Sequence, residues 1–197
     1  MLMIATGYIN KLKSIVIFLF ILVSFESNIP VFSSEKGIES LIEGQKLVFI
    51  RHSLAPGNGD PDNFDINDCS TQRNLNHQGI TQSKKIGFFF KKNKIKIEKV
   101  LSSEWCRCKD TARYAFQKYK TFNALNSFYS EKFYKNKVKQ IKDLKNYINN
   151  WSGKKNIIFV THFVVISELL NIGVSSGEII IVDKNLNIIE RIKTQNN

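Results

Sequence analysis

The sequence has little arginine and little cysteine, and it has no internal repeat or low-complexity tract. Of its 29 basic residues, 24 are lysines and five are arginines. Cysteine, proline and histidine occur three times each. The absence of repeats excludes a solenoid or propeller array. With 197 residues, the chain is long enough for one domain with a sizeable core.

The sequence also lacks an apolar run long enough to cross a bilayer as a helix. Its longest run, residues 15–23, has nine residues, whereas a membrane-spanning helix needs about 20. Lys11 and Lys13 precede this run, and small residues near 31–33 fit a signal-peptidase site. We therefore predict a secretory signal peptide over residues 1–33 and one periplasmic or secreted domain over residues 34–197, without stable membrane insertion after cleavage. An uncleaved membrane anchor is the alternative.

The net charge is strongly positive. It is +12 for the whole chain, and residues 34–197 carry 27 basic and 16 acidic groups, or +11. This balance favours anionic partners such as phosphorylated substrates, lipopolysaccharide, nucleic acid or an anionic membrane surface. The lysines are scattered over predicted helix faces between residues 84 and 155, which is typical of solvated surfaces. A nucleic-acid partner is therefore not expected.

The scarcity of arginine makes its positions informative. In a chain that uses lysine for general charge, arginine is expected where a planar, permanently charged fork binds phosphate or carboxylate. Arg51, Arg73 and Arg107 lie in predicted loops or at the ends of predicted elements. For each of them alone, a surface ion pair is the alternative.

Predicted strands alternate with predicted helices. Three apolar runs have the composition of buried strands, at residues 47–50, 100–101 with their flanks, and 157–160. Helical spacing of apolar residues occurs over residues 78–92, 108–119 and 138–151. A hairpin is expected around a turn at residues 184–187. The pattern predicts an α/β fold, a three-layer sandwich with a mainly parallel central sheet and a C-terminal edge hairpin.

Polar and basic residues follow each predicted strand. In open α/β sheets, ligands bind beyond the carboxyl ends of the strands. The three predicted exits carry Arg51 and His52, then Ser102, Ser103 and Arg107, then Thr161 and His162. We expect these groups to converge on one anion-binding pocket.

The same residues resemble the motifs of the histidine phosphatase superfamily, the phosphoglycerate mutase-like proteins. Arg51-His52-Ser53 is similar to the family's Arg-His-Gly, and residues 75–83 resemble its Leu-Thr-x-x-Gly-x-x-Gln-Ala helix start. Residues 102–112 resemble its Ser-Ser-x-x-x-Arg-x-x-x-Thr-Ala segment, and His162 stands at its second histidine. The resemblance covers residues 46–193, and four separated matches are more specific than one short motif.

The resemblance implies a phosphomonoesterase that acts on a small phosphorylated substrate and needs no metal or cofactor, and the predicted signal peptide makes it an extracytoplasmic one. It makes His52 the nucleophile that forms a phosphohistidine, Arg51 and Arg107 the groups that hold the phosphoryl oxygens, and His162 the residue that completes the site. Two other interpretations stay open. One is a weakly active or inactive phospho-ligand-binding protein of the same fold. The other is an anionic polymer-binding module, in which the FFFKKNK run would contribute, although that run is better explained as a core-facing helix surface.

Two departures from the family pattern affect the site. Ser53 stands where the family has glycine, and residues 124–130 lack the carboxylate that many members use as the leaving-group acid. We favour Asp60 as the acid, because prolines and glycines flank it, over Asp62, Asp65, Asp68 and Glu104. A turn aspartate bonded to its own backbone is the alternative for Asp60. Arg73 is a candidate substrate-side or supporting contact.

The three cysteines form an odd set. Cys106 and Cys108 are two residues apart, a spacing that disfavours a mutual disulfide at a helix start. Cys69 bridged to one of them would tie the loop carrying Arg73 to the turn carrying Arg107. The alternatives are three free buried thiols, or a zinc site of three thiolates that lacks a nearby fourth ligand. The sequence leaves the pairing and the oligomeric state open.

Overall fold

The computed structural model describes residues 35–194, which form a six-stranded sheet covered by helices on both faces. The predicted signal peptide, residues 1–33, lies outside the described residues. The strands are β1 (Leu47–Arg51), β2 (Ile97–Ser102), β3 (Lys120–Thr121), β4 (Asn156–Thr161), β5 (Ile179–Val182) and β6 (Ile188–Ile192).

The strand order is β3-β2-β4-β1-β5-β6. The pairs β3–β2, β2–β4 and β4–β1 are parallel, whereas β5 runs antiparallel to β1 and to β6. The mainly parallel sheet and the edge hairpin are therefore confirmed.

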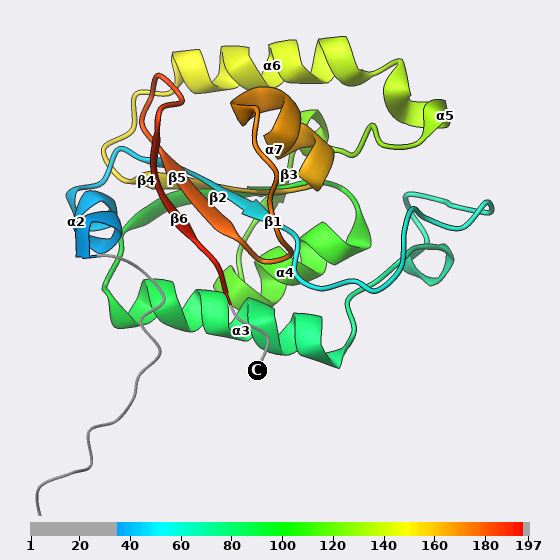
Figure 1. The fold of residues 1–197 in the computed structure, drawn as a ribbon, viewed down its shortest axis with the longest axis horizontal. Coiled ribbons are helices and arrows are strands. Elements are labelled where there is room, and N and C mark those ends of the chain that lie inside the picture. The colour runs from blue at the N-terminus through cyan, green and yellow to red at the C-terminus, as the bar shows by residue number, and fades with distance from the viewer. Residues whose placement is uncertain (1–34, 195–197) are drawn as a thin grey trace, which may run out of the picture. The chain divides into compact units, whose positions relative to one another are not determined.

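Both faces of the central strands are buried, as the unbroken apolar runs predict. All six residues of β4 are buried, and so are the first four of β1. On one face, α6 (Lys137–Asn150) and α7 (Phe163–Leu170) pack on a cluster that includes Phe49 and Phe159, whose rings stack at 4.9 Å. On the other, α3 (His77–Lys92) and α4 (Cys106–Phe116) pack on a cluster that includes Ile50 and Val160. Figure 1 shows these two helix layers on opposite sides of the strands.

Leu41 of α2 (Glu35–Glu43) joins the α3 side of the core. The shorter helices are α5 (Glu131–Tyr134) and two single 3₁₀ turns, Cys69–Thr71 and Asn123–Leu125. Among residues 35–194, no helix has the length and apolar character needed to span a membrane.

Two details of the predicted helix faces are wrong. Phe88 is 65% exposed while Phe90 is buried, so the FFF run is not one core-facing surface. Successive helical residues are about 100° apart, which places three in a row on different sides. Val138, the first residue of the predicted face of α6, is 79% exposed because it lies before the part of the helix that crosses the sheet core at Leu144 and Ile148.

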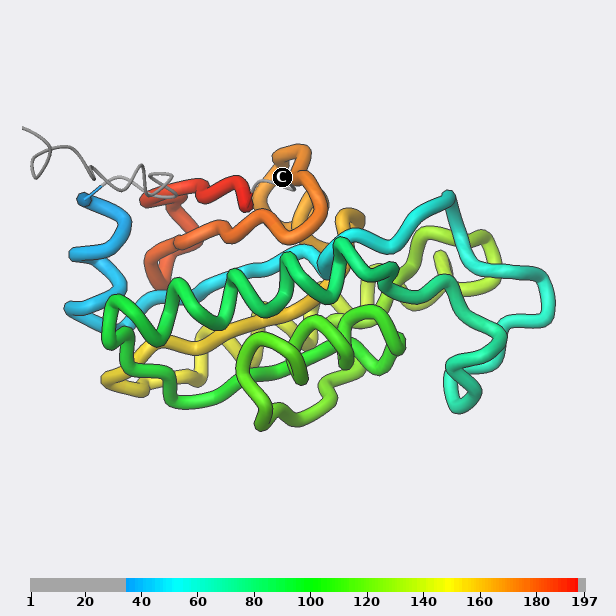
Figure 2. The backbone as a smooth tube through the Cα atoms, turned by 90° about the horizontal axis from the view of Figure 1, so that it is seen from below, coloured from blue at the N-terminus to red at the C-terminus, as the bar shows by residue number. Residues whose placement is uncertain are grey.

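Two segments extend from the end of the sheet where β1, β2 and β4 finish. One is the loop between β1 and α3, and the other is the stretch between the second 3₁₀ turn and α5. Figures 1 and 2 both show them side by side, and the rings of Phe64 and Phe133 meet with centroids 5.6 Å apart. Together these segments build walls above the strand ends.

Candidate active site

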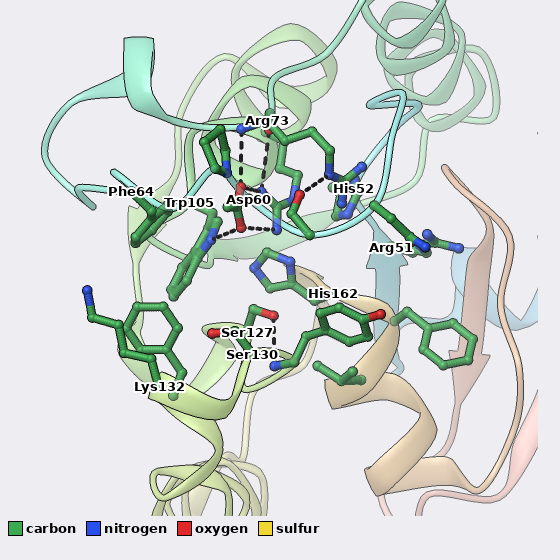
Figure 3. Close-up of a pocket in the computed structure, with 18 of the residues that line it drawn as sticks. Arg51, His52, Asp60, Phe64, Arg73, Trp105, Ser127, Ser130, Lys132 and His162 are labelled. Atoms are coloured by element: carbon green, nitrogen blue, oxygen red, sulfur yellow. Dashed lines mark hydrogen bonds and ion pairs between the residues drawn. The ribbon is translucent and has the colours of Figure 1, made fainter.

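A cavity of about 430 Å³ lies beyond the carboxyl ends of the parallel strands. Its inner end brings together four of the predicted site residues, Arg51, His52, Arg107 and His162. Asp60 and Arg73 line the same cavity (Figure 3). The strand exits therefore converge on one pocket, as their positions in the sequence predict.

The His52 ring is held in one tautomer. It is 2% exposed, and its Nδ1 lies 2.9 Å from the carbonyl oxygen of Ser53. Because a carbonyl only accepts, Nδ1 carries the proton and Nε2 keeps its lone pair. Burial, followed by the positive charge of Arg107, lowers the pKa of His52 well below its usual value. His52 is therefore a neutral imidazole with one free nitrogen.

His162 directly precedes α7, and its ring lies opposite that of His52, with ring centroids 5.5 Å apart. Its Nε2 lies 2.8 Å from the hydroxyl oxygen of Ser103 and 3.5 Å from the sulfur of Cys108. Burial and then the charge of Arg107 lower the pKa of His162 well below its usual value. Two neutral imidazoles thus stand beside the guanidinium groups.

A chain of hydrogen bonds behind His162 was not predicted from the sequence. Ser103 donates to Oδ1 of Asn126 at 3.1 Å, and Nδ2 of Asn126 donates to Oε2 of Glu104 at 2.6 Å. The Ser103 hydroxyl also lies within hydrogen-bond distance of Nε2 of His162, so this chain positions the His162 ring. Ser103 and Glu104 adjoin the strand exit, but only the fold brings Asn126 to them.

Both inner arginines keep unused donors. Arg51 donates from Nη1 to the carbonyl of Val174 at 2.8 Å, and Arg107 donates from both terminal nitrogens to Asp60. The Nε atoms of Arg51 and Arg107 are buried, and neither has a hydrogen-bond partner within the described part of the chain. A buried N–H without a partner is unfavourable, so it marks a place where an anion would be stabilised.

Asp60 is the counter-ion of Arg107. Its carboxylate accepts from Nη1 and Nη2 of Arg107 at 2.6 and 3.1 Å, from Nε1 of Trp105 at 3.0 Å and from the backbone N–H of Arg73 at 3.1 Å. Burial alone would raise the pKa of Asp60, but the hydrogen bond and charge of Arg107 outweigh it and lower the pKa. A leaving-group acid must be protonated before it acts, so this arrangement differs from the predicted role of Asp60.

The other carboxylates considered for the acid lie in different settings. Asp65 and Asp68 accept hydrogen bonds from residues of their own loop, which is the turn role. Asp62 lines the outer cavity and is exposed. Glu104 is bonded to Asn126 behind His162.

Arg73 folds the loop that carries Asp60. Its Nε donates to the carbonyl of Gly59 at 2.8 Å, and its Nη1 donates to the carbonyl of Ala55. Its own carbonyl accepts from Arg107 at 3.4 Å. Arg73 therefore supports the pocket wall, and no ion pair of Arg73 occurs among the described residues.

Ser53 fits the position of the family's glycine without backbone strain. It is not among the described residues with positive φ, and its N–H donates to the hydroxyl of Thr111 at 2.9 Å. Its own hydroxyl oxygen lies 2.8 Å from that of Ser83 on α3. The serine thus connects β1 to both α3 and α4.

The predicted disulfide of Cys69 is confirmed, with Cys106 as its partner and a Cα–Cα distance of 5.7 Å. It joins the loop to the first residue of α4, directly before Arg107. Cys108 is free and buried, and burial raises its pKa to about 12. Two of the three thiolates of the alternative zinc site are used in the bond. Across residues 35–194, no three His, Cys, Asp or Glu side chains are grouped so that they could hold a metal ion.

No protein-family model matches the chain, and no curated protein matches its sequence. Solved structures share its fold. The protein histidine phosphatase SixA, solved with tungstate, has a TM-score of 0.55 at 16% identity over 76% of this chain and 97% of its own. Phosphoglycerate mutase from Thermus thermophilus has a TM-score of 0.54 at 12% identity, covering 76% and 99%. The mycobacterial glucosyl-3-phosphoglycerate phosphatase has a TM-score of 0.50 at 14% identity, over 77% of this chain and 98% of its own. The chain therefore has the phosphoglycerate mutase-like fold of histidine phosphatases, as its motifs indicate.

Proposed function

We propose that this chain, which has the fold of SixA and phosphoglycerate mutase, is an extracytoplasmic phosphomonoesterase that works through a phosphohistidine on His52. One observation carries the proposal. A buried, neutral His52 presents a free Nε2 in a pocket where Arg51 and Arg107 each have an unused, buried Nε donor. A nucleophile beside preorganised cations is what phosphoryl transfer requires.

The reaction would proceed in two displacements. Nε2 of His52 attacks phosphorus, the N–P bond forms, the P–O ester bond breaks, and the alkoxide takes a proton from solvent. Water then attacks the phosphorus of phosphohistidine, the N–P bond breaks, the proton lost by water returns to solvent, and inorganic phosphate leaves. Arg51 and Arg107 stabilise the charge on the phosphoryl oxygens in both steps.

The hydrogen bond from Nδ1 of His52 to Ser53 supports this role, because it holds the attacking nitrogen in position and stabilises the imidazole as positive charge develops. His162 lies opposite, and its ring is positioned by the hydrogen bond between its Nε2 and the Ser103 hydroxyl. The guanidinium groups supply fixed positive charge, so we propose that the enzyme needs no divalent metal ion.

The proposed location outside the cytoplasm has two supports. The sequence has a charged segment and a short apolar run before residue 34. The Cys69–Cys106 bond belongs to an oxidising compartment, since cytosolic thiols are kept reduced.

The test is hydrolysis of p-nitrophenyl phosphate by the purified protein. His52→Ala should lower kcat/KM by at least about 10³-fold, because it removes the nucleophile. Arg107→Ala should lower it by about 10²-fold or more through lost charge stabilisation. EDTA should change it by less than about twofold, since Arg51 and Arg107 provide the charge. Quenching with alkaline detergent should trap a phosphoryl group on His52, because the N–P bond of phosphohistidine is stable in alkali and hydrolyses in acid.

His77→Ala is the matched control, because His77 is exposed at the start of α3, outside the cavity, and its loss should leave turnover unchanged. Full activity in His52→Ala, or activity abolished by EDTA and restored by zinc or magnesium, would contradict the proposal. Phosphate binding without any turnover would instead support the inactive phospho-ligand-binding protein.

A further inference from the structure

The outer part of the cavity is lined by aromatic rings. The inner end holds the histidines and arginines, whereas the walls toward solvent carry five aromatic side chains, Phe64, Trp105, Tyr129, Phe133 and Phe163. They come from four separate parts of the chain: the loop after β1, the residue before α4, the segment that leads into α5 together with α5 itself, and the first residue of α7. None of these aromatic residues stands at a defining position of the motifs that predict the catalytic site.

Three of the rings form one continuous wall. Phe64 stacks on Trp105 with centroids 5.1 Å apart, and Phe133 meets both edge-to-face at 5.6 and 5.4 Å. Trp105 also meets the ring of His162 at 5.4 Å. Nε1 of Trp105 donates to Asp60, which fixes the orientation of the indole ring. The wall therefore begins beside His162, at the inner end of the cavity (Figure 3).

Two further rings stand at the cavity without full burial. Tyr129 is 62% exposed and Phe163 is 41% exposed. The guanidinium of Arg51 lies over the Phe163 ring at 5.6 Å, so this ring adjoins the phosphate end of the cavity. Large apolar side chains that stay exposed around a concave site are typical of ligand contacts.

Charge in the outer part is sparse. Besides Arg51, Arg107 and the wall residue Arg73, the described lining contains one further Lys or Arg, Lys132, and two acidic residues, Asp60 and Asp62. Such a lining does not provide for a second phosphate group. It provides for an apolar, flat group attached to the phosphorylated oxygen.

We infer that the substrate is a phosphomonoester whose alcohol carries an aromatic ring one or two bonds from the phosphorylated oxygen. This inference rests on the proposed phosphatase function and adds the class of leaving group. The Trp105 ring lies 5.4 Å from the ring of His162, which in turn lies 5.5 Å from that of His52, so the wall begins two ring contacts from the proposed nucleophile. A ring close to the phosphorylated oxygen would therefore lie at this wall. Aromatic rings favour edge-to-face and offset-stacked partners over saturated groups of equal size.

The test compares three primary phosphomonoesters of similar leaving-group acidity, namely benzyl phosphate, cyclohexylmethyl phosphate and glycerol 3-phosphate. We expect kcat/KM for benzyl phosphate to exceed that for glycerol 3-phosphate by about tenfold or more, because the ring is removed from water. It should exceed that for cyclohexylmethyl phosphate by roughly 2- to 10-fold, because only the aromatic geometry differs.

Two variants locate the effect. Phe133→Leu and Phe64→Leu keep apolar bulk and remove a ring, so each should reduce the benzyl to cyclohexylmethyl ratio toward one. Phe88→Leu is the matched control, because Phe88 is an exposed aromatic residue on α3 outside the cavity lining. Its ratio should equal that of the unmodified protein. If the ratio of kcat/KM for benzyl phosphate to that for cyclohexylmethyl phosphate stays unchanged in both variants, the aromatic wall does not bind the substrate ring.

Binding separates this inference from the proposed function. Calorimetry on His52→Ala, which does not turn over, should give tighter binding of benzyl phosphate than of glycerol 3-phosphate. Equal kcat/KM and equal binding for all three esters would overturn the aromatic preference while the phosphatase activity stands. Selective binding of benzyl phosphate with no hydrolysis in the unmodified protein would keep the preference and remove the phosphatase. If the His52→Ala variant binds none of the three esters and the unmodified protein hydrolyses neither them nor p-nitrophenyl phosphate, both are wrong.

Discussion

Asp60 and Arg107 form the most consequential contact at the scale of single residues. Both terminal nitrogens of Arg107 are occupied by the Asp60 carboxylate, although Arg107 is also the group proposed to hold the phosphoryl oxygens. A phosphate that enters the pocket therefore meets Asp60 as a competitor for the same guanidinium, or shares it through the unused Nε. Asp60 could act as this competitor or as the leaving-group acid, and the two roles predict different effects on activity when its charge is removed.

We predict that Asp60→Asn strengthens inhibition by inorganic phosphate roughly 3- to 10-fold, because the competing negative charge is removed. The same change should lower the free energy of unfolding by about 1–3 kcal/mol, since Arg107 is 3% exposed and loses a charged partner. Inhibition assays and denaturant unfolding measure the two effects.

If Asp60 were instead the leaving-group acid, Asp60→Asn would lower kcat by about 10²-fold or more for an alkyl phosphate and spare an ester with a good leaving group. Asp60→Glu serves as the matched variant, because it keeps the charge and shifts the carboxylate by one methylene. The comparison of alkyl and p-nitrophenyl esters across these variants decides between the two roles.

Residue types and strand ends were enough to predict the inner pocket. Arg51, His52 and His162 directly follow or end apolar runs, so a parallel sheet must bring them to one edge. Asn126 and Glu104 were not predictable as partners of His162, because 22 residues separate them and no periodic pattern links them. Their relation depends on tertiary packing.

At the scale of elements, the loop between β1 and α3 is held by side chains rather than by regular structure. Arg73 donates to loop carbonyls, and Gln72 donates from Nε2 to the carbonyls of Asp65 and Ile66. Cys69 ties the loop to α4. The prolines and glycines indicated a loop, but its path is set by these long-range bonds, which no local pattern encodes.

Helix α7 shows a different kind of limit. The apolar segment after His162 has no capping side chain and no helical signal that would predict its structure, yet residues Phe163–Leu170 form a helix. Its first turn follows a buried strand and packs over β1, so tertiary contacts stabilise it. Helices α3, α4 and α6 show clear apolar spacing and were predicted within three residues of their observed ends.

We predict that Cys69→Ser destabilises the protein by about 3–4 kcal/mol, because the bond closes a loop of 37 residues. The melting temperature should fall by roughly 6–15 °C for a domain of this size. KM should rise, since the loop carries Asp60 and Phe64 to the pocket.

A reductant provides the matched control for this variant. Dithiothreitol should lower the melting temperature of the unmodified protein and leave that of Cys69→Ser unchanged. Alkylation of the non-reduced protein should modify one cysteine, Cys108, after denaturation, and three after reduction. Three modified cysteines without reduction would show that the bond is absent.

At the scale of the whole molecule, the layers follow from burial on both faces of the central strands. The runs at 47–50 and 157–160 do not alternate, and the structure buries them completely between two helix layers. The strand order β3-β2-β4-β1-β5-β6 was not predictable from these runs, because it depends on how the crossover helices pack. Because β1 and β4 are neighbours in this order, the rings of His52 and His162 meet edge-on at the ends of the two strands.

The sheet arrangement buries two neutral imidazoles, those of His52 and His162, in a strongly basic protein. His52 and His162 are 2% and 3% exposed, and burial and then Arg107 lower the pKa of both well below the usual value of 6.5. The unfolded chain binds protons at these histidines below about pH 6.5, whereas the folded chain does not. The contribution of these two histidines to the free energy of unfolding is therefore fully present above about pH 6.5. It is lost as the pH falls toward their pKa values in the folded chain.

We predict that the free energy of unfolding decreases by about 3 kcal/mol between pH 7 and pH 5, because each histidine contributes a slope of up to about 1.4 kcal/mol per pH unit. Asp60, whose pKa is also lowered, contributes only near and below its usual value of 3.8, outside this interval. Urea unfolding under non-reducing conditions measures the change. His52→Asn should reduce the loss by about half, since one of the two buried imidazoles is removed. His77→Asn should keep the full loss, because His77 is exposed. A protein equally stable at pH 5 and pH 7 would show that the folded chain takes up as many protons over this range as the unfolded chain, and the lowered pKa values of His52 and His162 would then be wrong.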